Sequence, residues 1–329
     1  MTDREHRLEA PHRRLQPGSP VFERAVVVGY KAFAWLISHL PPVLPRVLLG
    51  GGAQLSYLLW PTKRRWSNAN FGHVLGLSPH HPRVWRTALK AYGAYGRYVV
   101  ELARLPKLAR EHADGLVAGA NLDAIHDIWE ASEGGLIFTF GHVGNAEAAA
   151  AGVASRGWPI SVVADDSSFP GLFEEFRRTR EQWGVHVIPW RNLREIYGIL
   201  RAREMLALLI DWGYRADGIP VRLFDAWTTL PAGPATLAAK TGSRILPITI
   251  HRNPDGRTFA ISWAPPISVP SSSPADLQRA TQAMADAFAA SIAPDPTQWY
   301  TFKPIWPADS AERDALEARA AAMTSVEAA

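Results

Sequence analysis

The 329-residue chain contains no cysteine. Disulfides, cysteine-ligated zinc and thiol nucleophiles are therefore excluded. The histidines are scattered, and neither an H-x3-H nor an H-E-x-x-H spacing occurs, so the sequence predicts no metal site. No recognisable nucleic-acid-binding motif is present, and we expect no nucleic-acid partner.

The chain also lacks a large net charge and a long uninterrupted apolar run. Its formal net charge is +4, although the pI is 9.4. Arginine outnumbers lysine. The planar guanidinium of arginine binds phosphates and carboxylates in a bidentate manner, so partners of this kind are favoured. The apolar stretch that begins at Val21 is interrupted by Lys31 and falls short of the roughly 20 residues that a membrane-spanning helix needs. The glycines at 50–52 lack the lysine of a phosphate-binding loop, so no nucleotide site is predicted there.

The N-terminal end combines a polar tail with apolar segments. Residues 1–20 are charged, contain proline and show no apolar period, so we expect a disordered tail and no signal peptide. Residues 21–66 predict an apolar helical hairpin that ends in a basic cluster at 63–65, flanked by Trp60 and Trp66. Such a segment suits a surface that lies in the lipid interface, and we expect it to associate with a membrane. The alternative is an ordinary hairpin packed on the core.

The remainder of the chain alternates short apolar runs with amphipathic segments. This alternation predicts an α/β fold with a mostly parallel central sheet flanked by helices. We expect one domain over residues 21–308 and a C-terminal tail at 309–329, which from Ala311 on is alanine-rich and charged and has a frayed helix as the alternative. The predicted strands lie at 135–138, 160–164, 184–189, 205–210, 245–251 and 258–263. The predicted helices lie at 84–105, 122–132, 147–156, 172–183, 193–203, 235–240 and 275–292.

One string, residues 138–147, carries the chemistry. It places His142 just after a buried strand, at the carboxyl end where open α/β sheets bind their ligands. A histidine held near a carboxylate can act as a general base on a hydroxyl. Glu147 follows five residues later, which on a regular helix is about 140° away, so a contact between the two requires His142 to lie in the turn. Asp211, after another predicted strand, is placed to reach the same histidine, and the sequence does not rank the two acids.

The segment from Gly141 to Glu147 resembles the H-x-G-N-W-[DE] motif of bacterial lysophospholipid acyltransferases, in particular the lipid A late acyltransferases. Further blocks agree in order and spacing over residues 21–307. They are Arg180 before Gly184, the strand ending at Asp211, the x-x-P-x-G-P-A-x-L-A block at 229–238, the segment 241–247, and the closing tryptophan block at 298–306. The sequence departs from the pattern at Ala146, at Trp212 after the second acid, and at 223–225, where F-F-G is usual.

The resemblance implies a membrane-associated O-acyltransferase, peripheral or monotopic at the cytoplasmic face of the cell membrane. Its donor would be acyl-CoA or acyl carrier protein, with no other cofactor. Its acceptor would be a glycolipid or phospholipid such as a phosphatidylinositol mannoside. The alternatives are a lipid A precursor as acceptor, an acyl thioesterase, and a non-catalytic lipid-binding protein.

The resemblance also implies roles for particular residues. His142 would be the general base, Glu147 and Asp211 its acids, and Arg180 a ligand of a substrate phosphate. Backbone N–H groups near Gly144, Asn145 or Gly233 would stabilise the developing oxyanion. Most of these residues have a plainer alternative: Glu147 as a helix-dipole partner, Asp211 as a helix or turn cap, Arg180 as part of a solvated basic face, Asn145 as an N-cap, and Gly233 as a residue that shapes its loop.

Overall fold

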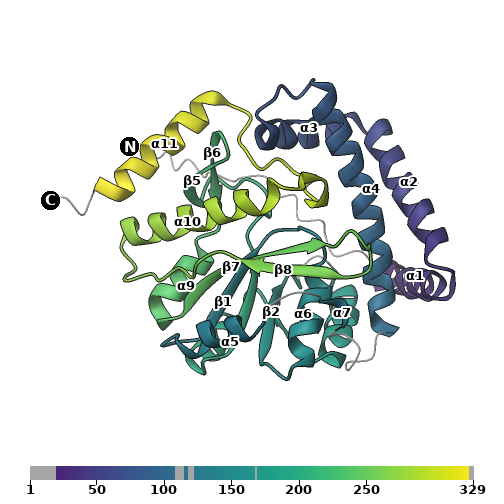
Figure 1. Ribbon diagram of the computed structural model, residues 1–329, viewed down its shortest axis with the longest axis horizontal. Helices are drawn as coiled ribbons and strands as arrows, with labels where there is room; N and C mark the ends of the chain where they lie inside the picture. The colour runs from purple at the N-terminus through teal and green to yellow at the C-terminus, as the bar shows by residue number, and fades with distance from the viewer. Residues whose placement is uncertain (1–19, 108–114, 118–121, 167–168, 326–329) are drawn as a thin grey trace, which may run out of the picture.

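The computed structural model describes residues 20–107, 115–117, 122–166 and 169–325 (Figure 1). Its centre is a six-stranded sheet with the order β3-β2-β4-β1-β7-β8. All neighbouring strands are parallel except β7 and β8, which form an antiparallel hairpin. The expected α/β fold with a mostly parallel sheet is therefore confirmed. The strands are β1 (Leu136–Phe140), β2 (Ile160–Ala164), β3 (Val185–Pro189), β4 (Met205–Leu209), β7 (Arg244–Arg252) and β8 (Phe259–Trp263).

Helices cover both faces of this sheet, and its central strands β1 and β4 are apolar on both sides. Successive side chains of a strand point to opposite faces. In β1, Leu136 and Phe138 join one buried cluster while Ile137 joins another, and in β4 Ala207 and Leu206 divide in the same way. One face carries α5 (Leu122–Glu130) and α6 (Ala146–Ser155); the other carries α8 (Leu193–Arg201), α9 (Gly233–Thr241) and α10 (Pro274–Ile292). Helix α7 (Pro170–Gln182) lies beside α6 (Figure 1).

The N-terminal part is a layer of four helices at the edge of the molecule. They are α1 (Pro20–His39), α2 (Val43–Leu59), α3 (Pro61–Leu75) and α4 (Pro82–Arg104), which a short 3₁₀ turn at Leu105–Lys107 extends. The two apolar helices α1 and α2 pack mainly against α4 and hardly touch each other. The predicted apolar helical hairpin is therefore not confirmed, because α4 supplies the partner surface for both helices. No helix in the described ranges combines the length and apolar character needed to cross a bilayer.

Close contact between α2 and α4 depends on Gly96. A Cβ at this position would lie 2.4 Å from the carbonyl oxygen of Leu49. We expect Gly96→Ala to lower the free energy of unfolding by about 3 kcal/mol, because the two backbones must separate. Urea unfolding measures this. Gly29→Ala in α1, where a Cβ meets nothing within 4 Å, is the control and should leave stability unchanged or raise it. Equal stabilities for the two variants would contradict the tight α2–α4 packing.

Two elements were not predicted, and the C-terminal segment, predicted as a tail or a frayed helix, forms a packed helix. Helix α3 was not predicted because its buried face is polar: Ser67, Asn68 and Asn70 are almost fully buried, and Asn70 donates to the carbonyl of Lys303 at 2.7 Å. The antiparallel pair β5 (Ile219–Leu223) and β6 (Ala226–Leu230) was missed as well. The predicted C-terminal tail contains helix α11 (Ser310–Ser325), which packs against β5, β6 and α10 and buries Leu316.

Candidate active site

The loop after β1 holds His142 in a fixed position outside any helix. The carbonyl of His142 accepts a hydrogen bond from the N–H of Tyr300 at 2.8 Å, and the N–H of Gly144 donates to Gln298 at 3.0 Å. Gly144 has a φ of +62°, and a Cβ there would lie 2.0 Å from the carbonyl oxygen of Ile250. Only glycine fits this conformation and this contact. The N–H of Gly144 is used by this bond, so the structure does not offer it to an oxyanion.

Asp211 is the acid that contacts the histidine. Strands β1 and β4 are parallel neighbours with Phe140 opposite Leu209, so the residues that follow them meet at one edge of the sheet. Asp211 Oδ1 lies 2.7 Å from His142 Nδ1, and Oδ2 accepts hydrogen bonds from the backbone N–H of His142 at 2.8 Å and from Trp299 Nε1 at 2.9 Å. Trp299 thus orients the carboxylate, a role that its place in the closing tryptophan block did not reveal.

Burial and charge act in opposite directions on this pair. Burial disfavours the imidazolium, but the charge of Asp211 and its hydrogen bond outweigh burial and raise the pKa of His142 above 6.5. Burial also disfavours the Asp211 carboxylate, yet the charge of His142 and the hydrogen bonds from His142 and Trp299 lower its pKa below 3.8. With Nδ1–H donated to Asp211, Nε2 is left as the acceptor. The geometry therefore prepares His142 to take a proton at Nε2.

Glu147 does not contact the histidine. Its carboxylate forms a two-point ion pair with Arg180 of α7, with Nε–Oε2 at 2.8 Å and Nη2–Oε1 at 2.5 Å. Both side chains are 17% exposed. Arg180, which the sequence suggested as a phosphate ligand, is thus already paired with a carboxylate, and the pair ties α6 to α7 beside His142. Asn145 takes its plainer role: its Oδ1 accepts from the N–H of Ala148 and caps α6.

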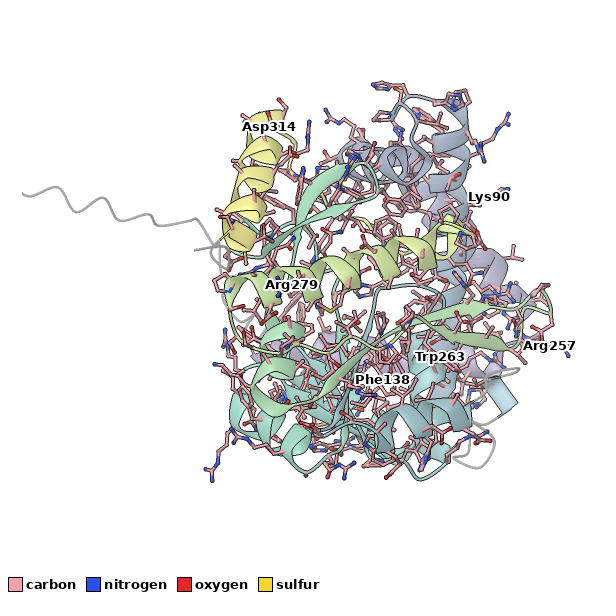
Figure 2. All side chains as sticks on the ribbon, turned by 60° about the vertical axis from the view of Figure 1, so that its left-hand side comes forward. Lys90, Phe138, Arg257, Trp263, Arg279 and Asp314 are labelled. Carbon is pink, nitrogen blue, oxygen red and sulfur yellow. The ribbon has the colours of Figure 1, made fainter. Side chains whose placement is uncertain are left out.

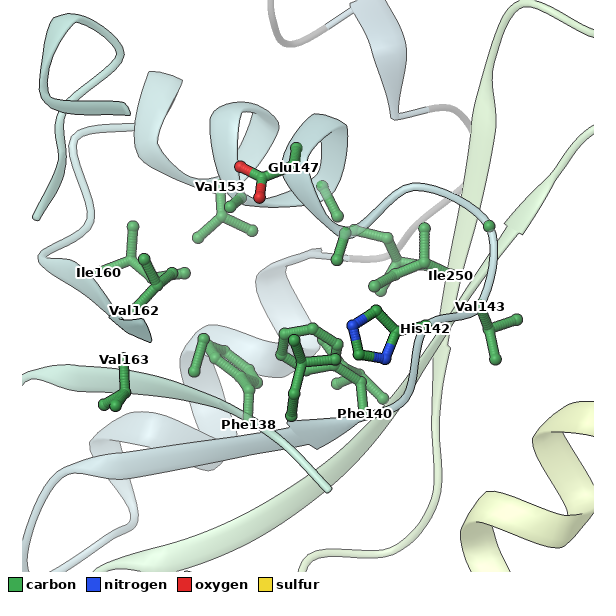
Figure 3. Close-up of a pocket in the computed structure, with 18 of the residues that line it drawn as sticks. Phe138, Phe140, His142, Val143, Glu147, Val153, Ile160, Val162, Val163 and Ile250 are labelled. Atoms are coloured by element: carbon green, nitrogen blue, oxygen red, sulfur yellow. The ribbon is translucent and has the colours of Figure 1, made fainter. Parts of the chain in front are cut away.

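An apolar cavity of about 250 Å³ opens at His142 (Figure 3). Alternate residues of the strands form one wall, among them Phe138 and Phe140 of β1. The opposite wall is α6, and its small side chains leave space between helix and sheet. In the sequence, this alanine run gives no sign of the space beside it. Other lining residues are Glu147, Ala149, Ala150, Val153, Ile160, Val162, Ala207, Ile250 and, near the His142–Asp211 pair, Tyr98, Arg180, Trp212 and Tyr300. Gly233 is exposed at the start of α9 and does not line the cavity, so the structure does not bring it to this site.

The site consists of a histidine at the carboxyl end of a central strand, a buried carboxylate partner and an adjoining apolar cavity. This combination fits the class of acyltransferases. The bacterial lipid A biosynthesis acyltransferase family matches residues 19–307. The chain belongs to this family and is an acyltransferase.

Individual relatives agree along almost the whole chain. The chain is 29% identical to the phosphatidylinositol mannoside acyltransferase of Mycolicibacterium smegmatis over 301 residues, which is 88% of this chain and 94% of the relative. It is also 29% identical to the protein of the same name from Mycobacterium tuberculosis H37Rv over 305 residues, 90% of this chain and 93% of the relative. The resemblance seen in the sequence motifs is therefore confirmed.

Proposed function

We propose that this protein transfers a fatty acyl chain from acyl-CoA or acyl carrier protein to a hydroxyl of a membrane glycolipid or phospholipid, with His142 as the general base. The observation that carries the proposal is the His142–Asp211 pair at the opening of an apolar cavity. A phosphatidylinositol mannoside is the favoured acceptor, because relatives matched over most of the chain carry that name.

The chemistry follows from the free nitrogen of His142. The acceptor oxygen attacks the thioester carbonyl while Nε2 takes the hydroxyl proton, because an alcohol is too weak an acid to ionise at neutral pH. The new C–O bond forms, the C–S bond breaks, and the imidazolium returns the proton to the leaving thiolate. Asp211 stabilises the imidazolium between these two steps. The acyl chain would occupy the cavity beneath α6, with its carbonyl beside His142.

The exposed faces of α1 and α2 support attachment to a membrane. Large apolar side chains there face solvent: Phe22, Val28, Trp35, Leu36, Val43, Leu44, Val47, Leu48, Leu55, Leu58 and Leu59 are each about half exposed or more. Soluble monomeric proteins rarely expose so many large apolar side chains on neighbouring helices, because large exposed apolar patches usually mark interaction sites. Lys63 lies over the rings of Trp60 and Trp66, which adds a cationic and aromatic border. We place the protein at the cytoplasmic face of the membrane, held peripherally or monotopically, where acyl thioesters are available.

The test is acyl transfer by the purified protein. Long-chain acyl-CoA and acyl carrier protein are offered in turn with a membrane lipid extract, and products are identified by mass spectrometry. A new acylated lipid supports the proposal and identifies its acceptor. Release of free fatty acid alone, with every acceptor present, would indicate a thioesterase. Binding of lipid without turnover of either donor would indicate a non-catalytic lipid-binding protein.

We expect the side chains at the far end of the cavity to set the preferred length of the acyl chain. Val153 lies seven residues beyond Ala146 on α6, about 10 Å further along the helix, and both line the cavity. We expect Val153→Phe to change the ratio of kcat/KM for long against short acyl-CoA by about tenfold in favour of short chains, since a few methylenes must leave the cavity. Val153→Ala should shift the preference the other way. If both variants keep the wild-type ratio, the acyl chain lies elsewhere.

A further inference from the structure

A second cavity, of about 310 Å³, lies on the other side of the first turn of α6. Asn145 and Ala148 line this cavity, whereas Ala146 and Glu147 line the catalytic one. Four basic residues from separate parts of the chain also line it. They are Arg46 at the start of α2, Arg104 and Lys107 at the end of α4, and Arg257 in the turn of the β7–β8 hairpin, where Figure 2 shows it at the edge of the molecule.

The positive charge of this cavity is not balanced by the described residues that line it. Their one carboxylate, Glu101, is already bound by both outer nitrogens of Arg252, at 2.5 and 2.6 Å, and by the amide of Asn145 at 3.2 Å. In addition, Nε of Arg97 lies 3.4 Å from Oε1 of the same carboxylate. Glu101 is therefore fully engaged, and the cations of the lining are left in excess.

One buried guanidinium atom of the cavity lining has no acceptor. Within the described part of the chain, Nε of Arg46 is buried without a hydrogen-bond partner. Such orphaned donors are uncommon in native proteins and call for an explanation, such as a ligand. Burial, followed by the charge of Arg252 and then that of Arg46, lowers the pKa of the neighbouring Arg97, although Glu101 acts in the opposite direction. A bound anion would balance the excess positive charge and supply the missing acceptor.

The surroundings of Arg46 indicate which anion. Arginine binds phosphate with two parallel hydrogen bonds. On α2, Arg46 lies between exposed apolar residues, of which Val43 is 69% and Val47 65% exposed. Arg104 in turn donates to the carbonyls of Ile37 and Leu40 at the end of α1, so the cavity adjoins the exposed apolar surface of both helices. A phosphate beneath an apolar surface is the arrangement of a phospholipid headgroup below its acyl chains.

We propose that the cavity lined by Arg46, Arg104, Lys107 and Arg257 binds the phosphate of an anionic membrane lipid, whose chains lie against α2. This site takes no part in the acyl transfer step, and it rests on the proposed function only in that the protein works at a membrane. The phosphates of CoA share the same chemistry, so the experiment must separate the two sources.

The test compares two double variants that remove the same charge. Arg46→Gln/Arg257→Gln alters the cavity, and Arg83→Gln/Arg86→Gln removes two exposed arginines near the start of α4, which do not line it. Binding is measured to phosphatidylcholine vesicles with and without phosphatidylinositol, in the absence of any acyl donor. We expect the cavity variant to bind phosphatidylinositol vesicles about tenfold more weakly than wild type, and the control to bind as wild type does.

Other outcomes would overturn the proposal. Equal weakening in both variants would indicate general charge attraction, and unchanged binding in both would leave the cavity with no role in lipid binding. Weaker binding of free CoA by the cavity variant, with vesicle binding unchanged, would assign the phosphate to the donor. Arg46→Lys/Arg257→Lys, which keeps the charges, should retain most vesicle binding. This result would show that substitution at the two positions does not itself unfold the protein. Because no donor is present, this result is independent of whether acyl transfer occurs.

Discussion

An enzyme with alanine in place of His142 is expected to transfer acyl chains about 10³-fold more slowly than wild type, within the range that general-base catalysis contributes. The side chain is 36% exposed and has its Nδ1 held by Asp211, so no neighbouring group replaces the lost base. The loss should appear in kcat, because the acyl cavity is formed mainly by other residues. Product formation under saturating donor measures it.

A second histidine provides the control for His142→Ala. His186 in β3 is half exposed and its Nε2 lies 2.7 Å from Glu195, outside the cavity. His186→Ala should keep the wild-type rate. Full activity in His142→Ala, with an unfolding midpoint equal to that of wild type, would show that His142 is not the general base.

The sheet and the edge that carries His142 and Asp211 were predictable because they rest on local patterns. Apolar runs with flanking turns located β2 without error and β1, β3, β4 and β7 to within a residue or two. His142 and Asp211 each lie two residues beyond the ends of β1 and β4, and parallel strands bring their carboxyl ends to one edge. Which acid binds the histidine depends on tertiary geometry. Glu147 turns toward α7, and only the position of Arg180 in space shows why.

The missed elements have their own physical causes. Helix α3 buries asparagines that find partners such as Lys303, 233 residues away in sequence, so its face lacks an apolar period. Helix α11 buries few residues, Leu316 and Ala320, and its alanine-rich sequence resembles that of a solvated tail. The cavity itself follows from small side chains on α6, and an alanine run does not reveal whether the space beside it is filled.

The pairing of His142 with Asp211 predicts a second large loss. In Asp211→Asn the amide has nearly the same shape but presents an N–H₂ donor to Nδ1. The ring must then carry its proton on Nε2, where the base is needed. We expect the rate to fall by roughly 10³–10⁴. The fold should persist, since one oxygen remains to accept from the backbone N–H of His142 or from Trp299.

The pH dependence distinguishes this role from simple structural support. The base must be neutral, so activity rises with pH through the pKa of His142. Because Asp211 raises that pKa, the acidic limb of kcat/KM in wild type should have its midpoint above 6.5. Removing the negative charge leaves burial, which disfavours the charged ring, so the residual activity of Asp211→Asn should show a midpoint at lower pH.

Glu147→Gln is the matched control, since it removes one carboxylate charge from the same cavity without touching His142. The midpoint of its acidic limb should stay at the wild-type value. Its defect should appear in stability instead, because breaking a buried pair that holds Arg180 costs about 3–5 kcal/mol. The two side chains are largely but not fully buried, so the lower end of that range is expected. A shifted limb in Glu147→Gln together with an unshifted limb in Asp211→Asn would reverse the assignment and make Glu147 the partner of the base.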